Sequence, residues 1–222
     1  SGLENKVFHF GNGAEPQGLD PHIVTGVPEH HLLIGLCEGL TTSNPKGGSS
    51  FPGAAQSWDI SEDGTTYTFY LQKNGKWSNG DLVTADDFVW SWKRILTPSL
   101  GSQYPDMLYY VKGAAEYHTG LINDFNDVGV KALDDYTLEV TLNNPTPFFL
   151  GLLSHYSTWP VHKETVLQHG AIDDRNGQWT RPGNFVCNGA FKLKTWELNN
   201  KIIVEKNENY WDSKTVQLDE IH

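Results

Sequence analysis

Sulfur is scarce in this chain of 222 residues, which holds two cysteines and one methionine. Cys37 and Cys187 lie far apart, and no Cys-x-x-Cys pair or zinc-type spacing occurs, which excludes the common structural zinc sites and thioredoxin-like redox motifs. The two cysteines could pair in an oxidising compartment, but isolated cysteines are as often small buried apolar residues. We favour two free, buried thiols over a disulfide, and the sequence leaves the pairing open.

Positive charge is also scarce. Lys and Arg number 16 against 27 Asp and Glu, and the net charge is −11 with His neutral. Such a chain repels phosphates and anionic lipids, so we discount nucleic acid and membrane surfaces as partners. No stretch approaches the roughly 18 apolar residues of a membrane span, and no signal peptide is recognisable. The opening Ser1-Gly2 resembles the scar of a cleaved tag, so a signal could have been removed.

Catalytic motifs are missing as well: no Gly-x-Ser-x-Gly, His-Glu-x-x-His or phosphate-binding loop occurs. Two acidic pairs, Asp86-Asp87 and Asp134-Asp135, are the candidates for acid–base work, which needs carboxylates about 5–10 Å apart across a substrate. The first pair is predicted to open a helix, where acids complement the helix dipole, and the second to form a turn. We therefore expect a protein that is not an enzyme.

Metal binding has one candidate, His30-His31. Adjacent residues of a helix point about 100° apart, so these two side chains do not form the chelating pair that i and i+4 positions would. We expect no metal and no cofactor.

Aromatic residues are what the sequence has in abundance, at 12% of the chain. Such side chains fill cores and also line sites for organic ligands. Four tryptophans could form a platform for sugars, although we favour core positions for them; they are Trp58, Trp77, Trp90 and Trp92.

Hydrophobic periodicity and turn residues predict a mixed α/β chain with no internal repeat. Asp63-Gly64 predicts a tight hairpin turn, and Thr84 with Asp87 predicts a helix cap. The alternating segment before His222 needs a partner strand, and we expect more chain to follow it. Strands are predicted at 6–10, 55–60, 66–71, 128–133, 137–142, 189–196, 201–206 and 216–221, and helices at 28–40, 84–97, 104–117, 146–153 and 163–169.

Several passages together resemble a known family. In their order and spacing they cover nearly the whole chain, and they are similar to the peptide/nickel type (family 5) of extracellular solute-binding proteins of ABC importers, its oligopeptide-binding members in particular. The passages are Gly18-Leu19-Asp20-Pro21-His22, Gly26-Val27-Pro28-Glu29, Glu38-Gly39-Leu40, and those at 54–58, 67–71, 76–80, 83–92, 130–140, 188–193 and 206–211.

The resemblance implies an α/β fold of the periplasmic-binding-protein type (type II, cluster C). It implies that this chain is an incomplete lobe I with an inserted α+β subdomain. Residues 1–40 would be the first segment of lobe I, 41–163 the inserted subdomain, and 164–222 the second segment, leading to a second lobe beyond residue 222.

For function, the resemblance implies the substrate-binding component of an ABC importer, which captures oligopeptides in extended conformation between two lobes. The implied partners are the peptide, the membrane permease and the ATPase subunits, and the protein would be a monomer, either periplasmic or anchored outside a membrane. The alternatives within the family are binding of oligosaccharides or of nickel and metal chelates.

The resemblance also places a binding site. Thr25-Gly26-Val27 matches the segment whose backbone pairs with the peptide, although the residues alone favour a plain turn before a helix. Tyr104 matches a position that lines a side-chain pocket, and a core tyrosine is the alternative. Thr25 replaces the acidic residue expected there, so a basic ligand side chain should lose a partner. No residue is assigned to the ligand's charged ends, and we expect this part of the protein alone to bind peptide weakly or not at all.

Overall fold

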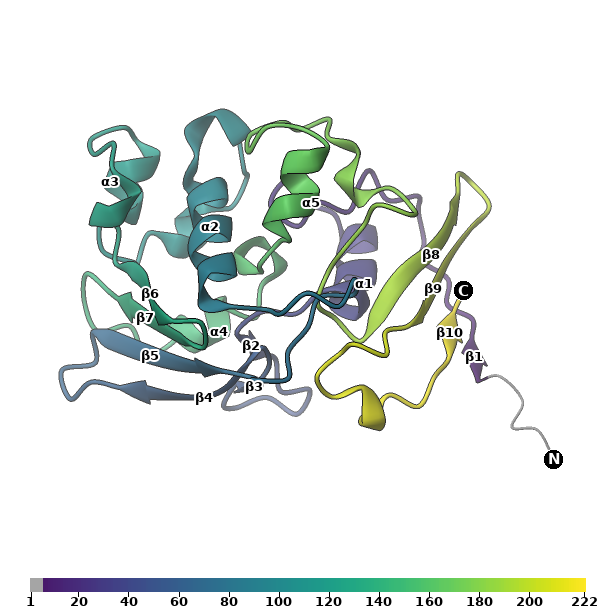
Figure 1. The fold of residues 1–222 in the computed structure, drawn as a ribbon, viewed down its shortest axis with the longest axis horizontal. Coiled ribbons are helices and arrows are strands. Elements are labelled where there is room, and N and C mark those ends of the chain that lie inside the picture. Colours follow the sequence, from purple (N-terminus) through teal and green to yellow (C-terminus); the bar gives the residue numbers. More distant parts are fainter. Residues whose placement is uncertain (1–5) are drawn as a thin grey trace.

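Two four-stranded sheets and a small sheet of two strands, with helices packed against them, make up the computed structural model, which describes residues 6–222 (Figure 1). The strands are β1 (Val7–Phe8), β2 (Thr41–Thr42), β3 (Phe51–Pro52), β4 (Ala55–Ile60), β5 (Thr66–Leu71), β6 (Val130–Asp134), β7 (Thr137–Thr141), β8 (Phe191–Glu197), β9 (Lys201–Lys206) and β10 (Glu220–Ile221). The helices are α1 (Val27–Leu36), α2 (Ala85–Leu96), α3 (Ala114–His118), α4 (Phe149–Leu152) and α5 (Lys163–Gln168).

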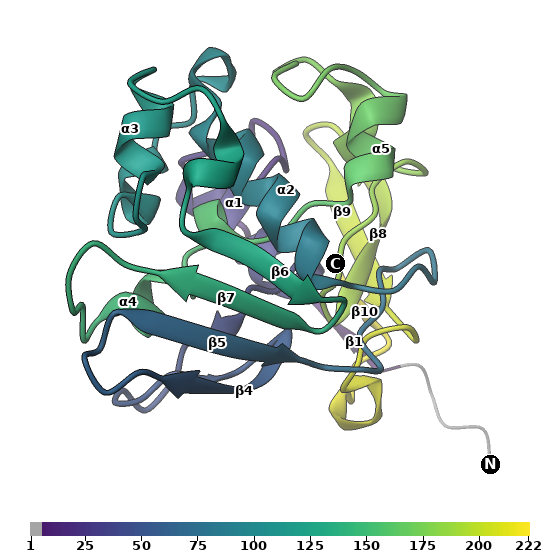
Figure 2. The same ribbon diagram turned by 60° about the vertical axis from the view of Figure 1, so that its left-hand side comes forward.

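The first sheet is antiparallel throughout, in the order β4-β5-β7-β6. Its β4–β5 hairpin closes at the predicted turn, where Gly64 donates its N–H to the carbonyl of Ser61 at 2.8 Å. The alternation in β5 buries Tyr67, Phe69 and Leu71. α2 lies across this sheet beside β6 (Figure 2). The predicted hairpins are confirmed.

α2 begins where the capping residues predict. Asp87 Oδ2 accepts a hydrogen bond from the backbone N–H of Thr84 at 2.8 Å, which satisfies one donor at the start of the helix. The side chains of Phe88, Trp92 and Ile95 are buried on one face of the helix. This amphipathic pattern holds α2 to the sheet.

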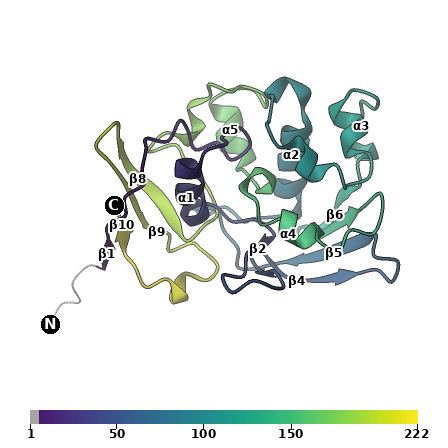
Figure 3. The same ribbon diagram turned by 180° about the vertical axis from the view of Figure 1, so that it is seen from behind.

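The second sheet has the order β1-β10-β9-β8 and joins the two ends of the described chain. β10 lies between β1, to which it is parallel, and β9, to which it is antiparallel (Figure 3). The strand predicted at 216–221 is therefore shorter, at Glu220–Ile221, and its partner strands lie within the described residues. α1 packs against β8 in the same part of the molecule.

The prediction of a single helix at 104–117 is wrong. The chain there forms a 3₁₀ turn at Pro105–Leu108 and then α3. Between them the backbone pairs like a strand: the N–H of Lys112 donates to the carbonyl of Thr141 at 2.9 Å. This pairing takes the place of the helical hydrogen bonds. Gly113 then turns the chain into α3 with φ of +75°, a conformation that favours glycine.

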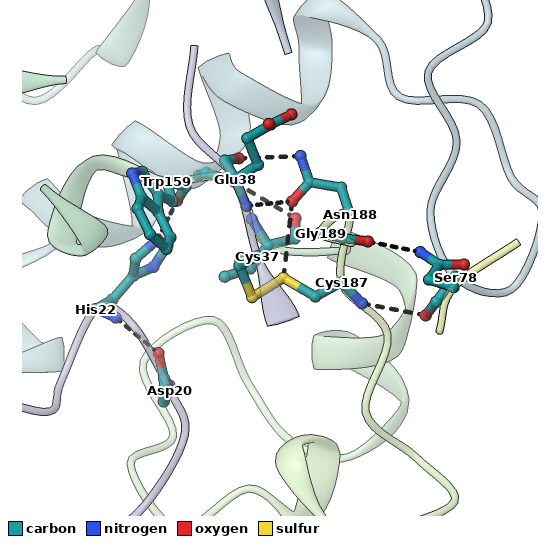
Figure 4. Close-up of a disulfide and its surroundings, with 12 residues drawn as sticks. Asp20, His22, Cys37, Glu38, Ser78, Trp159, Cys187, Asn188 and Gly189 are labelled. Carbon is teal, nitrogen blue, oxygen red and sulfur yellow. Dashed lines mark hydrogen bonds between the residues drawn. A yellow bond between two sulfur atoms is a disulfide. The ribbon is translucent and has the colours of Figure 1, made fainter. Parts of the chain in front are cut away.

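The expectation of two free thiols is also wrong. Cys37 and Cys187 form a disulfide whose Cα atoms are 5.3 Å apart, although 150 residues separate them in sequence (Figure 4). The bond ties the end of α1 to the loop before β8. Asn188 reinforces the junction, because its side chain accepts from the N–H of Glu38 and donates to the carbonyl of Glu38, both at 3.0 Å.

One buried core runs through both sheets, with Trp77, Trp92 and Trp179 among its largest side chains. The division of the chain at residues 40 and 163 into a lobe and an inserted subdomain stays a prediction. Within residues 6–222, every helix is too short or too polar to cross a membrane.

Candidate ligand-binding site

The segment Thr25-Gly26-Val27 presents unpaired backbone at the start of α1. Thr25 is exposed, and the Val27 side chain is 65% exposed. Within residues 6–222, the N–H groups of all three residues and the carbonyl of Thr25 have no hydrogen-bond partner. Gly26 is extended, with φ −88° and ψ 159°. Backbone groups in this state can pair with a second extended chain.

A buried ion pair fixes the loop that leads to this segment. Arg94 of α2 donates two hydrogen bonds to the carboxylate of Asp20, at 2.9 and 2.6 Å. Burial on its own would raise the pKa of Asp20, but the charge of Arg94 overcomes this and holds the pKa below its ordinary value. The loop at 17–25 is thereby attached to a helix far away in sequence.

His22 completes this anchor. Burial, together with the positive charge of Arg94, lowers the pKa of His22 to about 4, so the ring is neutral near pH 7. Its Nδ1 lies 2.9 Å from Arg94 Nη1 and its Nε2 lies 2.8 Å from the carbonyl of Trp159. Since arginine can only donate, Nδ1 accepts and the proton is on Nε2. The sequence showed Asp20 and His22 as part of a motif but gave no sign of their partner.

Glu29 packs against the segment Thr25-Gly26-Val27. Its side chain is buried, and Oε1 accepts from the N–H of Gln17 at 2.6 Å. Oε2 has no hydrogen-bond partner within the described residues and lies against Gly26, 1.9 Å from where a β-carbon would be. A β-carbon here would displace the Glu29 carboxylate, although the backbone φ is one that any residue adopts. The sequence indicated a glycine for close approach to a ligand and missed this second reason.

Tyr104 lies half-buried in an aromatic cluster next to α1. Its ring meets that of His155 edge-on at 5.1 Å and that of Tyr156 at 6.4 Å. Tyr156 in turn contacts His30 of α1, at 5.6 Å between ring centroids. The structure therefore links Tyr104 to α1 through one intervening ring. Its role as a pocket residue stays a prediction.

A hollow of about 490 Å³ opens beside Thr25. Its lining is mainly polar and comes from the loops at 17–25 and 175–181, with single residues from other parts of the chain. The lining residues used below are Thr25, Glu29, Gln103, Arg175 and Arg181. Gln103 directly precedes Tyr104, so this hollow brings Thr25 close to the chain segment that carries Tyr104.

The remaining candidates from the sequence have structural roles. Trp77 and Trp92 are buried, as favoured for the tryptophans, and cannot act as an exposed platform. Asp87 caps α2, and burial raises the pKa of its carboxyl to about 6. Asp134 accepts from the N–H of Tyr136 in its turn at 2.8 Å. No cluster of three or more metal-ligating side chains occurs in the part of the chain that the structure describes.

The described residues form an α/β unit with unpaired backbone at the start of α1. The chain belongs to the bacterial extracellular solute-binding proteins, family 5, since the model of the middle part of that family matches residues 51–222. The family expected from the sequence is confirmed.

Two curated relatives illustrate the similarity. The periplasmic oligopeptide-binding protein OppA of Escherichia coli (strain K12) is 44% identical over 216 residues, which are 96% of this chain and 38% of that protein. The dipeptide-binding protein DppE of Bacillus subtilis (strain 168) is 38% identical over 217 residues, 97% of this chain and 38% of the relative. The chain thus spans well under half the length of these relatives.

Solved structures confirm the fold class. The Haemophilus influenzae OppA complex with the peptide RPPGFSPFR superimposes with a TM-score of 0.90 at 39% identity, covering 99% of this chain and 42% of that one. The unliganded open form of the murein tripeptide-binding protein MppA gives a TM-score of 0.89 at 35% identity, with 99% and 41% covered. The fold is periplasmic-binding-protein-like, and the described residues correspond to part of it.

Proposed function

We propose that the protein is the substrate-binding component of an ABC importer and that it captures oligopeptides in extended conformation. The observation that carries this proposal is the unpaired backbone of Thr25-Gly26-Val27, held open by Glu29 and by the Asp20–Arg94 anchor. A peptide lying along this segment would gain main-chain hydrogen bonds, which do not depend on its sequence. Relatives that are named as oligopeptide- and dipeptide-binding proteins support the choice of ligand.

The site as described is one side of a clamp. Ligand sites in proteins bury most of the ligand surface, and an exposed segment such as Thr25–Val27 cannot do so alone. A second lobe would enclose the peptide, and the closed form would engage a membrane permease with its ATPase subunits. The proposed setting is the periplasm, or the outer face of a membrane by an anchor, with the protein acting as a monomer and without catalysis.

Oligosaccharides and metal chelates are the competing ligands. The burial of Trp77 and Trp92 speaks against a sugar platform built from the tryptophans. Nothing in the described residues favours a chelate over a peptide.

The test is isothermal titration of the protein extended to the full length of its relatives. We expect saturable binding, micromolar or tighter, with a pool of peptides of two to five residues, and none with cello- or xylo-oligosaccharides or nickel chelates. Heat with the sugars and none with the peptides would overturn the proposal.

A further inference from the structure

Arginine is rare in this chain, and its three copies are used in two different ways. Arg94 is buried and paired with Asp20 at 2.6 Å. Arg175 and Arg181 both line the hollow beside Thr25, and neither forms an ion pair within residues 6–222. Two uncompensated guanidinium groups therefore face one cavity.

Both guanidinium groups retain free donors. Arg175 Nη1 donates to the carbonyls of Leu100 and Gly101, which positions the group at the wall of the hollow. Arg181 Nε donates to Oε1 of Gln178 at 3.2 Å. The remaining N–H groups of the two side chains have no acceptor in the described part of the chain. A planar guanidinium with free N–H groups is the side chain best suited to a carboxylate.

Of the two carboxylates that line the same hollow, one is ion-paired and the other keeps one oxygen without a hydrogen-bond partner in the described residues. Asp20 is neutralised by Arg94, and Glu29 accepts from the N–H of Gln17 at 2.6 Å. Thr25, which joins the hollow to the unpaired backbone, carries no charge. With Asp20 paired to Arg94, the lining carries two guanidinium groups, on Arg175 and Arg181, against the one unpaired carboxylate of Glu29, so its net charge is positive.

We propose that this hollow receives a carboxylate of the bound peptide, held by Arg175 and Arg181. The inference rests on the proposed function and adds to it a preference for acidic peptides at one position. The carboxylate is either an Asp or Glu side chain or the C-terminus of the ligand. Either group would replace water on both guanidiniums, whose combined charge exceeds that of the Glu29 carboxylate in the same hollow.

The experiment measures peptide affinity by titration calorimetry on the protein of full length. Tetrapeptides carry Glu or its neutral isostere Gln at each position in turn, and each peptide is also made with an amidated C-terminus. The variants are Arg181→Gln and the double variant Arg175→Gln/Arg181→Gln. Lys46→Gln, an exposed change in the loop between β2 and β3, is the control that removes one positive charge elsewhere.

At one position the Glu peptide should bind about three- to tenfold more tightly than its Gln counterpart, in the range of a partly exposed charge-assisted hydrogen bond. If the carboxylate is a side chain, the double variant should bring this ratio to about 1, and Lys46→Gln should preserve the ratio. An effect of amidation in place of the Glu-to-Gln effect assigns the carboxylate to the C-terminus. Binding of Gln and Glu peptides alike with no effect of amidation, or a ratio that survives in the double variant, overturns this inference alone. Absence of binding by every peptide overturns the proposed function as well.

Discussion

The carboxylate of Glu29 fills the space beside Gly26, where its Oε2 atom lies 1.9 Å from the position of a β-carbon. The other oxygen of the same carboxylate holds the N–H of Gln17. Glu29 therefore fixes the approach to the unpaired segment, and a β-carbon at its centre would displace this carboxylate.

This contact predicts that substitutions at Gly26 and Glu29 have coupled effects on the free energy of unfolding. Gly26→Ala should lower the free energy of unfolding by about 1–3 kcal/mol, the usual cost of overpacking. In a Glu29→Ala background the same change should cost much less, because the obstructing carboxylate is gone. Urea unfolding of the two single variants and the double variant measures the coupling energy. Strictly additive losses would show that Glu29 does not determine the residue at 26.

The Asp20–Arg94 pair predicts a large effect from a single substitution. Arg94→Met should reduce the free energy of unfolding by about 3–5 kcal/mol, since it leaves a buried carboxylate without its partner. Lys192→Met provides the control, because Lys192 pairs with Glu205 at the surface and should cost about 1 kcal/mol or less. Chemical unfolding of both variants gives the comparison. Equal costs would mean that Arg94 does not anchor the loop.

Because of Glu38, we expect the free energy of unfolding to fall as pH rises. Burial raises the pKa of its carboxyl from 4.5 to about 7, against hydrogen bonds from Tyr210 and Trp211 that lower it. The folded protein therefore holds a proton that the unfolded chain has lost between these pH values. The stabilisation is complete below the unfolded value of 4.5 and is lost as pH passes through about 7.

Glu38→Gln removes this titration. Relative to the wild type, the variant should gain roughly 3 kcal/mol in free energy of unfolding between pH 4.5 and pH 8. This is the free energy that corresponds to the pKa shift of Glu38 from 4.5 to about 7. Urea unfolding across that range measures the difference. Glu62→Gln, at an exposed carboxylate, controls for the loss of one negative charge. A Glu38→Gln difference that stays constant with pH would contradict the interpretation.

The disulfide predicts sensitivity to reduction. Its two cysteines are 150 residues apart, so the chain-entropy model gives a stabilisation of roughly 5 kcal/mol. Urea unfolding with and without dithiothreitol should differ by several kcal/mol for the wild type and not at all for Cys37→Ala/Cys187→Ala. If the reductant has no effect on the wild type, the bond either does not form or does not stabilise the fold.

Local features of the fold could be predicted from sequence, and contacts between distant residues could not. Asp63-Gly64 marks the β4–β5 hairpin and Thr84 marks the start of α2, because turn and cap chemistry is carried by neighbouring residues. The pairing of β1 with β10 and the Cys37–Cys187 bond join parts of the chain that no local pattern connects. In the segment 104–117, the periodicity predicted a helix, but strand-like pairing of Lys112 with Thr141 interrupts it.

The same distinction holds for the site. Thr25-Gly26-Val27 came from the family resemblance, since the residues alone favoured a plain turn. The supports of this segment were missed, because Arg94 lies 74 residues from Asp20 in the sequence. Glu29 was visible as an acid three residues after Gly26 in the first turn of a helix, which is the one signal that could have revealed its contact.

The most direct test of the binding site removes one backbone donor. Val27 is the first residue of α1, its N–H has no partner within residues 6–222, and Gly26 before it is extended, so proline fits there. We compare peptide affinities of Val27→Pro and Val27→Ala in the full-length protein by titration calorimetry, with melting temperatures as the folding control. The proposal predicts that Val27→Pro binds peptides about tenfold more weakly than Val27→Ala at an unchanged melting temperature. Equal affinities of the two variants would contradict pairing of the ligand with this segment.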